Sequence, residues 1–281
     1  MKKNYLKNIT LVLISYRSEN KIIPFIKKIP KNLTVIIVEN YKKSNIENLI
    51  KKQKNIRIFK KKNNGVAASL NFAVKKIRTK YFIQISPDIR FDYKSLKKFT
   101  DIAKKLNEEF AALGPRFVNV NQKSHIQIDE KLKIGSIPSI HGSFLFINTK
   151  KFKEIGYYDD KIFLYFEETD YCKRGVLKNL KSFQINSIKV KQEGRSVEFK
   201  DNNEENKIKN LLSWHFIWSK FYYYKKHYGY IYALIYFLPI MIRTLFKLLI
   251  KKNGSDEFEK YKYRFDGLIN SILGKKSHLR P

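Results

Sequence analysis

Residues 9–18 read ITLVLISYRS, an apolar and largely β-branched run that ends in polar loop residues. A short apolar run bounded in this way is typical of a strand that is buried on both faces of a sheet. The same pattern returns further along the chain, at Thr34 to Val38, Ile56 to Phe59, Tyr81 to Ile85 and Ser143 to Ile147. We therefore expect these segments to be core strands.

Helical patterns separate the predicted strands. Ala67 to Ile77 and Ser95 to Leu106 each place apolar residues on one helical face. Strands that alternate with helices in this way predict an α/β layered domain. Polar residues collect after the strands, in residues 15–20, 39–44, 63–65 and 86–92. Because ligands of open α/β sheets bind beyond the carboxyl ends of the strands, we expect these loops to meet at one site.

The composition restricts the class of protein. The chain has 281 residues, of which 43% are hydrophobic, enough to build a core. Its formal net charge of +33 attracts polyanions, anionic membranes and phosphorylated substrates. Cys172 is the only cysteine, which excludes an intrachain disulfide and a cysteine-based zinc site. The apolar run from Ile9 to Ile14 is short and is soon followed by Arg17, so we interpret it as a strand and not as a signal peptide.

The composition changes in the C-terminal part of the chain. Trp214 to Tyr230 carries both tryptophans among tyrosines and lysines, and Ile231 to Ile250 is strongly apolar. The apolar stretch approaches the roughly 20 residues that cross a bilayer, but Arg243 and Lys247 make a full span costly. We expect an amphipathic or obliquely inserted helix at an anionic membrane surface. The alternative is a buried helix that packs on the α/β domain or on a partner in a homo-oligomer.

A cluster of carboxylates follows an aromatic run in residues 163–174, which read FLYFEETDYCKR. Glu167, Glu168 and Asp170 repel one another at this spacing. A helix that begins near Glu168 would favour the charges through its dipole and would place Asp170 one turn from Arg174. The stretch is therefore either an ordinary helix start or a site that requires carboxylates.

Several blocks in this order resemble a known family. SYRS at 15–18, VEN at 38–40, NNGVAASLN at 63–71 and ISPD at 85–88 are similar to the nucleotide-sugar half of family-2 glycosyltransferases with the GT-A fold. The branch that they resemble is the rhamnosyltransferase-like one. GSFLFI at 142–147, Phe152 to Asp160 and the carboxylate stretch are similar to the acceptor half of that branch, so the resemblance covers about Ile9 to Ser196.

The resemblance implies an α/β fold of the GT-A type, a Rossmann-like mixed sheet flanked by helices. The catalytic domain would comprise residues 1–212, with a nucleotide-sugar half at about 1–92 and an acceptor half at about 93–212. Residues 213–281 would form a C-terminal hydrophobic or amphipathic helical extension that associates with the membrane.

The resemblance also implies a donor site. Ser15 and Tyr16 would lie beside the nucleotide, and Glu39 would accept the N3 hydrogen of uracil or thymine where the family usually has Asp. The turn and helix beside the nucleotide sugar would use Asn63, Gly65 and Asn71, with Gly65 free to adopt a positive φ. The alternatives are ordinary packing for Tyr16 and a turn for Glu39 and for the Asn-Asn-Gly sequence.

A divalent metal is implied at Asp88, which matches the last acid of the family's Asp-x-Asp motif. Mg²⁺ or Mn²⁺ bound there would neutralise the leaving diphosphate. Ser86 replaces the first acid, and Gln192 stands where the family pattern has a His that can be a metal ligand. Gln192 would either bind the metal through its amide oxygen or lie at a solvated strand end, which leaves metal dependence open.

The carboxylate stretch would supply the base. The resemblance places Glu168 at the position of the family's catalytic base, usually an Asp, with Glu167 as the alternative. In an inverting reaction this carboxylate takes the proton of the acceptor hydroxyl. Neighbouring Glu167 and Asp170 would raise the pKa of Glu168, and a helix N-terminus would lower it. Asp170 would organise the motif through an ion pair with Arg174.

The sequence therefore predicts a membrane-associated inverting glycosyltransferase that uses a dTDP- or UDP-sugar, with rhamnose or a related deoxysugar as the transferred group. The acceptor would be a surface glycan or a polyprenyl-diphosphate-linked precursor at the cytoplasmic face of the cell membrane. The alternatives are a basic nucleic-acid-binding protein and a GT-A-like sugar nucleotidyltransferase. No nucleic-acid-binding module is recognisable, and residues 15–18 lack the Gly-rich loop of the nucleotidyltransferases.

Overall fold

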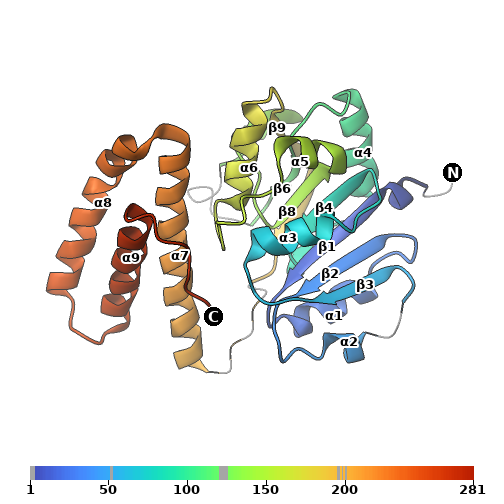
Figure 1. Cartoon of the computed structure of the whole chain (residues 1–281). Coiled ribbons are helices and arrows are strands. Elements are labelled where there is room, and N and C mark those ends of the chain that lie inside the picture. The colour runs from blue at the N-terminus through green and yellow to red at the C-terminus, as the bar shows by residue number, and fades with distance from the viewer. Residues whose placement is uncertain (1–3, 51–52, 120–125, 195–196, 198, 200) are drawn as a thin grey trace. The chain divides into compact units, whose positions relative to one another are not determined.

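A computed structural model of the chain describes residues 4–50, 53–119, 126–194, 197, 199 and 201–281 (Figure 1). The chain divides into two compact units. The α/β unit comprises Met1–Asn64, Ala68–Tyr158 and Glu168–Glu198. The helical unit comprises Gly65–Ala67, Asp159–Glu167 and Phe199–Pro281, so it includes a short segment from the middle of the chain.

The α/β unit is built on one mixed sheet, which has nine strands among the described residues. The strand order is β3-β2-β1-β4-β8-β6-β9-β5, and β7 pairs with β9. β1 pairs in parallel with β2 and β4, β2 pairs in parallel with β3, and β8 is antiparallel to β4. The strands are β1 (Ile9–Ser15), β2 (Thr34–Glu39), β3 (Ile56–Lys60), β4 (Tyr81–Ile85), β5 (Ile89–Arg90), β6 (Leu113–Phe117), β7 (Ile134–Ile137), β8 (Phe144–Asn148) and β9 (Ser182–Gln192).

Short helices connect and flank these strands (Figure 1). Consecutive residues Leu11, Val12 and Leu13 have no exposed surface, so both faces of β1 are covered, as a parallel α/β sheet requires. The helices are η1 (Asn4–Asn8), α1 (Glu19–Lys27), α2 (Ile46–Leu49), α3 (Val66–Val74), α4 (Ser95–Lys105), α5 (Thr149–Ile155) and α6 (Glu167–Val176).

The five predicted strands are confirmed as β1, β2, β3, β4 and β8, with β8 shifted by one residue from the predicted range. Both predicted helices are confirmed, although α3 ends at Val74 and residues 75–77 continue as hydrogen-bonded turns. The predicted helix near Glu168 is α6. β6 was not predicted, because its sequence LGPRF contains two residues that disfavour strands.

The helical unit contains α7 (Asn202–Tyr228), α8 (Tyr230–Ile250) and α9 (Asp256–Ile272). Gly229, at φ 93°, makes the sharp turn between α7 and α8. α9 packs closely on α7, because a Cβ on Gly267 would lie 2.7 Å from the carbonyl oxygen of Trp214. The indole nitrogen of Trp214 donates a 2.6 Å hydrogen bond to Asp266 Oδ2. The three helices also share an apolar core, formed by Ile217, Phe221, Ala233, Phe237 and Leu268.

Candidate active site

A buried carboxylate lies at the carboxyl ends of β1 and β2. Ser15 and Glu39 are the last residues of these strands and are paired in register. Ser15 Oγ donates a 2.6 Å hydrogen bond to Glu39 Oε2, and the backbone nitrogen of Tyr41 donates a 2.8 Å bond to Oε1. Glu39 has no exposed surface, and this burial raises its pKa, although the two hydrogen bonds act in the opposite direction. The predicted donor residues Ser15 and Glu39 are thus in direct contact.

A cavity of about 520 Å³ opens beside this carboxylate. Its volume falls within the range of small-molecule sites in proteins. The Tyr41 ring contacts the Tyr16 ring edge to face at 5.6 Å and lies 5.1 Å from the Arg17 guanidinium. The lining residues are Glu39, Asn40, Tyr41, Lys42, Lys60, Lys61, Lys62 and Asn63. The cavity therefore combines aromatic surface, one buried acid and a basic rim suited to a phosphorylated ligand.

Sequence reasoning missed Tyr41 and the lysines of residues 60–62. These lysines stand at the end of a predicted strand. β3 pairs with β2 so that Lys60 lies opposite Glu39, and this register brings the lysines to the cavity. Their position directly after a strand was the signal that could have identified them as ligand-site residues.

Gly65 lies directly before α3, and Asn71 lies within this helix. Gly65 has a φ of 97°, and a Cβ there would lie 2.2 Å from the carbonyl oxygen of Phe163, so any side chain would clash. The Asn71 amide makes a reciprocal pair with the backbone of Tyr158, donating to its oxygen at 2.9 Å and accepting from its nitrogen at 3.0 Å. Asn71 therefore fixes the chain just before the carboxylate stretch, and its contact with a donor stays a prediction.

The two residues predicted for metal binding lie together. Gln192 ends β9 opposite Ile89 of β5, and its Nε2 donates a 3.0 Å hydrogen bond to Asp88 Oδ2. Among the described residues, no group of three or more His, Cys, Asp or Glu side chains gathers as a metal cage. One hard carboxylate suits a cation that takes most of its ligands from a diphosphate. The residues present fit such a cation if the Gln192 amide turns its oxygen toward it.

Glu168 is half-buried in the first turn of α6, and its carboxyl group lies beside Gly142. A Cβ on Gly142 would lie 3.4 Å from the carboxyl carbon of Glu168. Burial raises the pKa of Glu168 to about 7, against the lowering effect of the backbone N–H groups of Glu168 and Thr169 at the helix start. As expected, one influence raises the pKa of Glu168 and the helix start lowers it. The main cause of the rise is burial, and not the predicted charge repulsion.

Asp170 and Arg174 form the predicted ion pair, with Arg174 Nε 2.8 Å from Asp170 Oδ2. Asp170 has no exposed surface, so the carboxylate of this pair is buried. Arg174 also donates to the carbonyl oxygens of Ile155 at 2.9 Å and Tyr157 at 2.5 Å. Such a buried, fully bonded pair holds α6 on the end of α5 and organises the motif. Glu167 is also buried.

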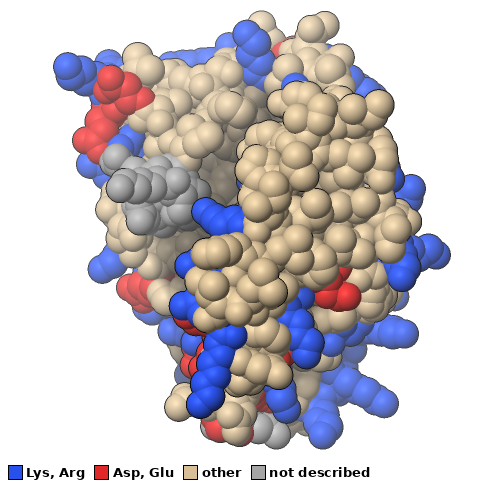
Figure 2. Space-filling view, turned by 90° about the vertical axis from the view of Figure 1, so that its left-hand side faces the viewer, with Lys and Arg blue, Asp and Glu red and all other residues tan. Residues whose placement is uncertain are grey.

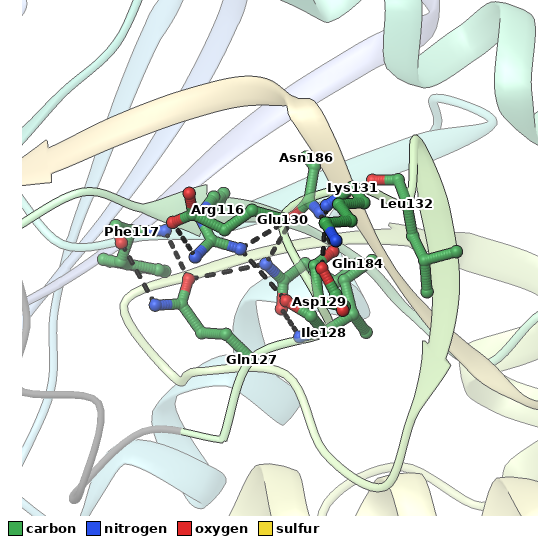
Figure 3. Close-up of polar contacts among 10 residues, drawn as sticks. All are labelled: Arg116, Phe117, Gln127, Ile128, Asp129, Glu130, Lys131, Leu132, Gln184 and Asn186. Atoms are coloured by element: carbon green, nitrogen blue, oxygen red, sulfur yellow. Dashed lines mark hydrogen bonds and ion pairs between the residues drawn. The ribbon is translucent and has the colours of Figure 1, made fainter.

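A second polar cluster surrounds Arg116, which is 8% exposed, at a register shift between β6 and β9 (Figure 3). Arg116 Nη1 donates to the oxygen of Ile128 at 3.0 Å and to Asn186 Oδ1 at 3.3 Å, and Nη2 pairs with Glu130. Asn186 Nδ2 donates 2.7 Å bonds to the oxygens of Asp129 and Leu132. The cluster therefore fastens residues 126–133 to the sheet.

We expect Arg116→Leu to lower the free energy of unfolding by about 1–3 kcal/mol, because the oxygen of Ile128 loses its Arg116 donor and Asn186 Oδ1 keeps only its bond from Gln184. Glu130→Gln should cost less than about 1 kcal/mol, since the Glu130 side chain is 75% exposed. Urea unfolding of both variants tests this. Equal losses would mean that the ion pair, and not the buried hydrogen bonds, provides the stability.

The strand order, with β1, β2, β3 and β4 parallel and β8 antiparallel to β4, together with the polar strand ends, defines a GT-A type of α/β domain. Residues 10–172, more than half of the chain, match the family described as glycosyl transferase family 2. The chain belongs to this family.

Two relatives illustrate the similarity. The chain is 20% identical over 202 residues to the low-salt glycan biosynthesis hexosyltransferase Agl10 of Haloferax volcanii. The alignment covers 64% of this chain and 65% of that protein. It is 30% identical over 148 residues to an uncharacterised glycosyltransferase of Rickettsia bellii, covering 47% of this chain and 21% of that protein. The matched regions span less than two thirds of either relative.

Solved structures confirm the predicted GT-A fold. The mannosyltransferase PcManGT from Pyrobaculum calidifontis, in complex with GDP-Man and Mn²⁺, matches with a TM-score of 0.60 at 10% identity, over 96% of this chain and 88% of that one. S. aureus TarS 1-349 in complex with UDP-GlcNAc matches with a TM-score of 0.55 at 12% identity, over 95% of this chain and 92% of that one.

Proposed function

We propose that this protein is an inverting glycosyltransferase whose catalytic base is Glu168. The observation that carries the proposal is the carboxyl group of Glu168 at the start of α6, against Gly142, with a pKa raised to about 7. A general base is most effective when its pKa lies near the working pH. A carboxylate of ordinary pKa would be a weaker proton acceptor.

In the proposed reaction, the acceptor hydroxyl gives its proton to Glu168 as its oxygen attacks the anomeric carbon. The new glycosidic bond forms on the face opposite the nucleotide diphosphate, and the bond between the anomeric carbon and the diphosphate oxygen breaks. Asp88, with Gln192 beside it, would hold a divalent cation, which when bound neutralises the departing diphosphate. Asp170 and Arg174 keep α6 in place during the transfer.

The donor proposal is a dTDP- or UDP-sugar. Glu39 is a buried hydrogen-bond acceptor beside the 520 Å³ cavity, and uracil and thymine each offer an N3 hydrogen to such a group. The rim lysines suit the phosphates. A rhamnosyl or related deoxysugar group is supported by the branch resemblance of residues 15–88, and Asn63, Gly65 and Asn71 would shape the sugar side.

The acceptor proposal is a surface glycan or its polyprenyl-diphosphate-linked precursor at the cytoplasmic face of the membrane. α8 is long and apolar enough to cross a bilayer, and much of its surface is exposed. The face of the molecule that carries α8 is largely free of charged side chains, and Lys and Arg stand at its margins (Figure 2). An apolar face with a basic margin suits an anionic lipid surface. A homo-oligomer that covers α8 is the competing arrangement.

The test is a screen of the purified chain for nucleoside-diphosphate release from UDP-, GDP- and dTDP-sugars, with a prenyl-linked acceptor. We expect release from a uracil or thymine donor, and a chelator should lower the rate if a cation at Asp88 supports departure. Pyrophosphate release would instead indicate a nucleotidyltransferase. An absence of turnover with every donor and acceptor would contradict the proposal.

A further inference from the structure

We propose that α7 of the helical unit positions the catalytic carboxylate, by holding the segment Asp159–Glu167 that leads directly into Glu168. The proposal rests on the function proposed for Glu168. It assigns the α7 residues Ser219 and Phe216 as positioning residues for the reaction, although they lie more than 45 residues further along the chain.

The segment ends in a strained turn. Tyr165 has a φ of 66° and Phe166 a φ of 70°, so two successive residues with side chains are in the left-handed region immediately before α6. Each such residue costs of the order of 1 kcal/mol and persists only where its surroundings enforce it. The turn therefore needs external contacts to keep its shape.

Residues of α7 provide these contacts. Ser219 Oγ donates a 2.8 Å hydrogen bond to the carbonyl oxygen of Leu164, directly before the turn. The ring of Phe216 contacts both rings of the turn, that of Tyr165 at 5.6 Å and that of Phe166 at 5.7 Å. Each strained residue is thus packed against α7, and the peptide before them is hydrogen-bonded to it.

The rest of the segment is fastened to the same helix. Asp159 accepts a 2.9 Å hydrogen bond from the Tyr222 hydroxyl and a 2.7 Å bond from Lys226 Nζ. The ring of Phe163 stacks on that of His215 at 4.4 Å. Residues 215, 219, 222 and 226 follow the i, i+4, i+7, i+11 spacing, so one face of α7 holds the segment from end to end.

The geometry has a direct consequence for Glu168. The turn sets the direction in which the chain enters α6, and the first turn of α6 contains both the Glu168 carboxyl group and the backbone N–H groups beside it. If the turn relaxes, the half-buried carboxyl group loses its place beside Gly142. It would then gain water and become a weaker base, while the donor-side residues of β1 and β2 stay as they are.

The experiment compares Ser219→Ala and Phe216→Ala with Ser213→Ala, a matched serine on the same helix outside the contacting face. We expect the first two variants to lower kcat about 10-fold or more, with a donor KM within about twofold of wild type. The acid limb of their pH–rate profile should move below the wild-type position, toward the ordinary range of a carboxyl group. Ser213→Ala should behave as wild type in both measurements.

The outcomes separate this inference from the proposed function. If wild type is active and Glu168→Gln is inactive, but Ser219→Ala keeps the wild-type kcat and acid limb, the positioning role of α7 is wrong and the base assignment stands. If Glu168→Gln is as active as wild type, the base assignment itself is wrong. Should Phe216→Ala fail to fold, Ser219→Ala decides, because it removes one hydrogen bond from an otherwise intact helix.

Discussion

Glu168→Gln is expected to lower turnover by about 10²–10⁴-fold, the range that general-base catalysis contributes. The amide has nearly the same shape as the carboxyl group but cannot accept the acceptor's proton. Donor binding should persist, since the Glu39 carboxylate and the lysine-lined cavity lie at other strand ends. Nucleoside-diphosphate release measures the first effect and titration calorimetry with the donor measures the second. Near-normal turnover would contradict the base role.

The same variant should be more stable than wild type in alkaline solution. The pKa of Glu168 is raised from 4.5 to about 7, so folding favours the protonated carboxyl group. The free energy of unfolding of wild type should therefore fall as the pH rises from about 4.5 through 7, and Gln removes that loss. We expect Glu168→Gln to be stabilised by about 1–3 kcal/mol at pH 8 and by little at pH 4.

Urea unfolding at the two pH values tests the stability effect, with the exposed Glu154→Gln as a control that should show little change at either pH. Because the proposed base acts when ionised, wild-type turnover should also rise with pH through about 7. A variant that gains no stability at pH 8 would show that the charged carboxyl group is well solvated in the folded protein.

Local patterns in the sequence were sufficient to predict strands β1, β2, β3, β4 and β8. The apolar runs at β1, β2, β3, β4 and β8 are continuous because the strands are covered on both faces, and this pattern identifies a strand without knowledge of its partners. The loops that follow β1 and β2 could also be placed, and Ser15 and Glu39 do meet at those strand ends.

Long-range packing could not be predicted in the same way. The pKa of Glu168 depends on burial, and Gly142, which lies beside its carboxyl group, is 26 residues away in the sequence. From the sequence, the pKa of Glu168 was expected to be raised by repulsion from Glu167 and Asp170, because only neighbours along the chain can be identified there. The inclusion of Asp159–Glu167 in the helical unit likewise depends on contacts with α7 that no local pattern encodes.

α8 provides the second large effect, in membrane binding. Ile231, Ile235, Leu238, Ile242 and Leu249 follow helical spacing on one side, and each is between 49% and 84% exposed. Ala233, Phe237 and Thr244, on the opposite side, are buried. An apolar stripe that faces away from the unit's own core has no partner among the described residues of the helical unit. Exposed Arg243 lies beside it, as expected for a helix at the surface of an anionic bilayer.

We therefore expect the triple variant Ile235→Ser, Ile242→Ser and Leu249→Ser to bind phosphatidylglycerol vesicles at least about 100-fold more weakly than wild type, since burial of each side chain contributes about 1.5–3 kcal/mol. Substitution is preferable to removal of the helix, because Tyr222 and Lys226 of the preceding helix hold Asp159. Vesicle co-sedimentation measures the loss, and Leu177→Ser, an equally exposed site on the α/β unit, is the control. Unchanged vesicle binding would contradict the membrane role of the stripe, and conversion of a dimer to a monomer in solution would instead identify it as a contact between copies of the chain.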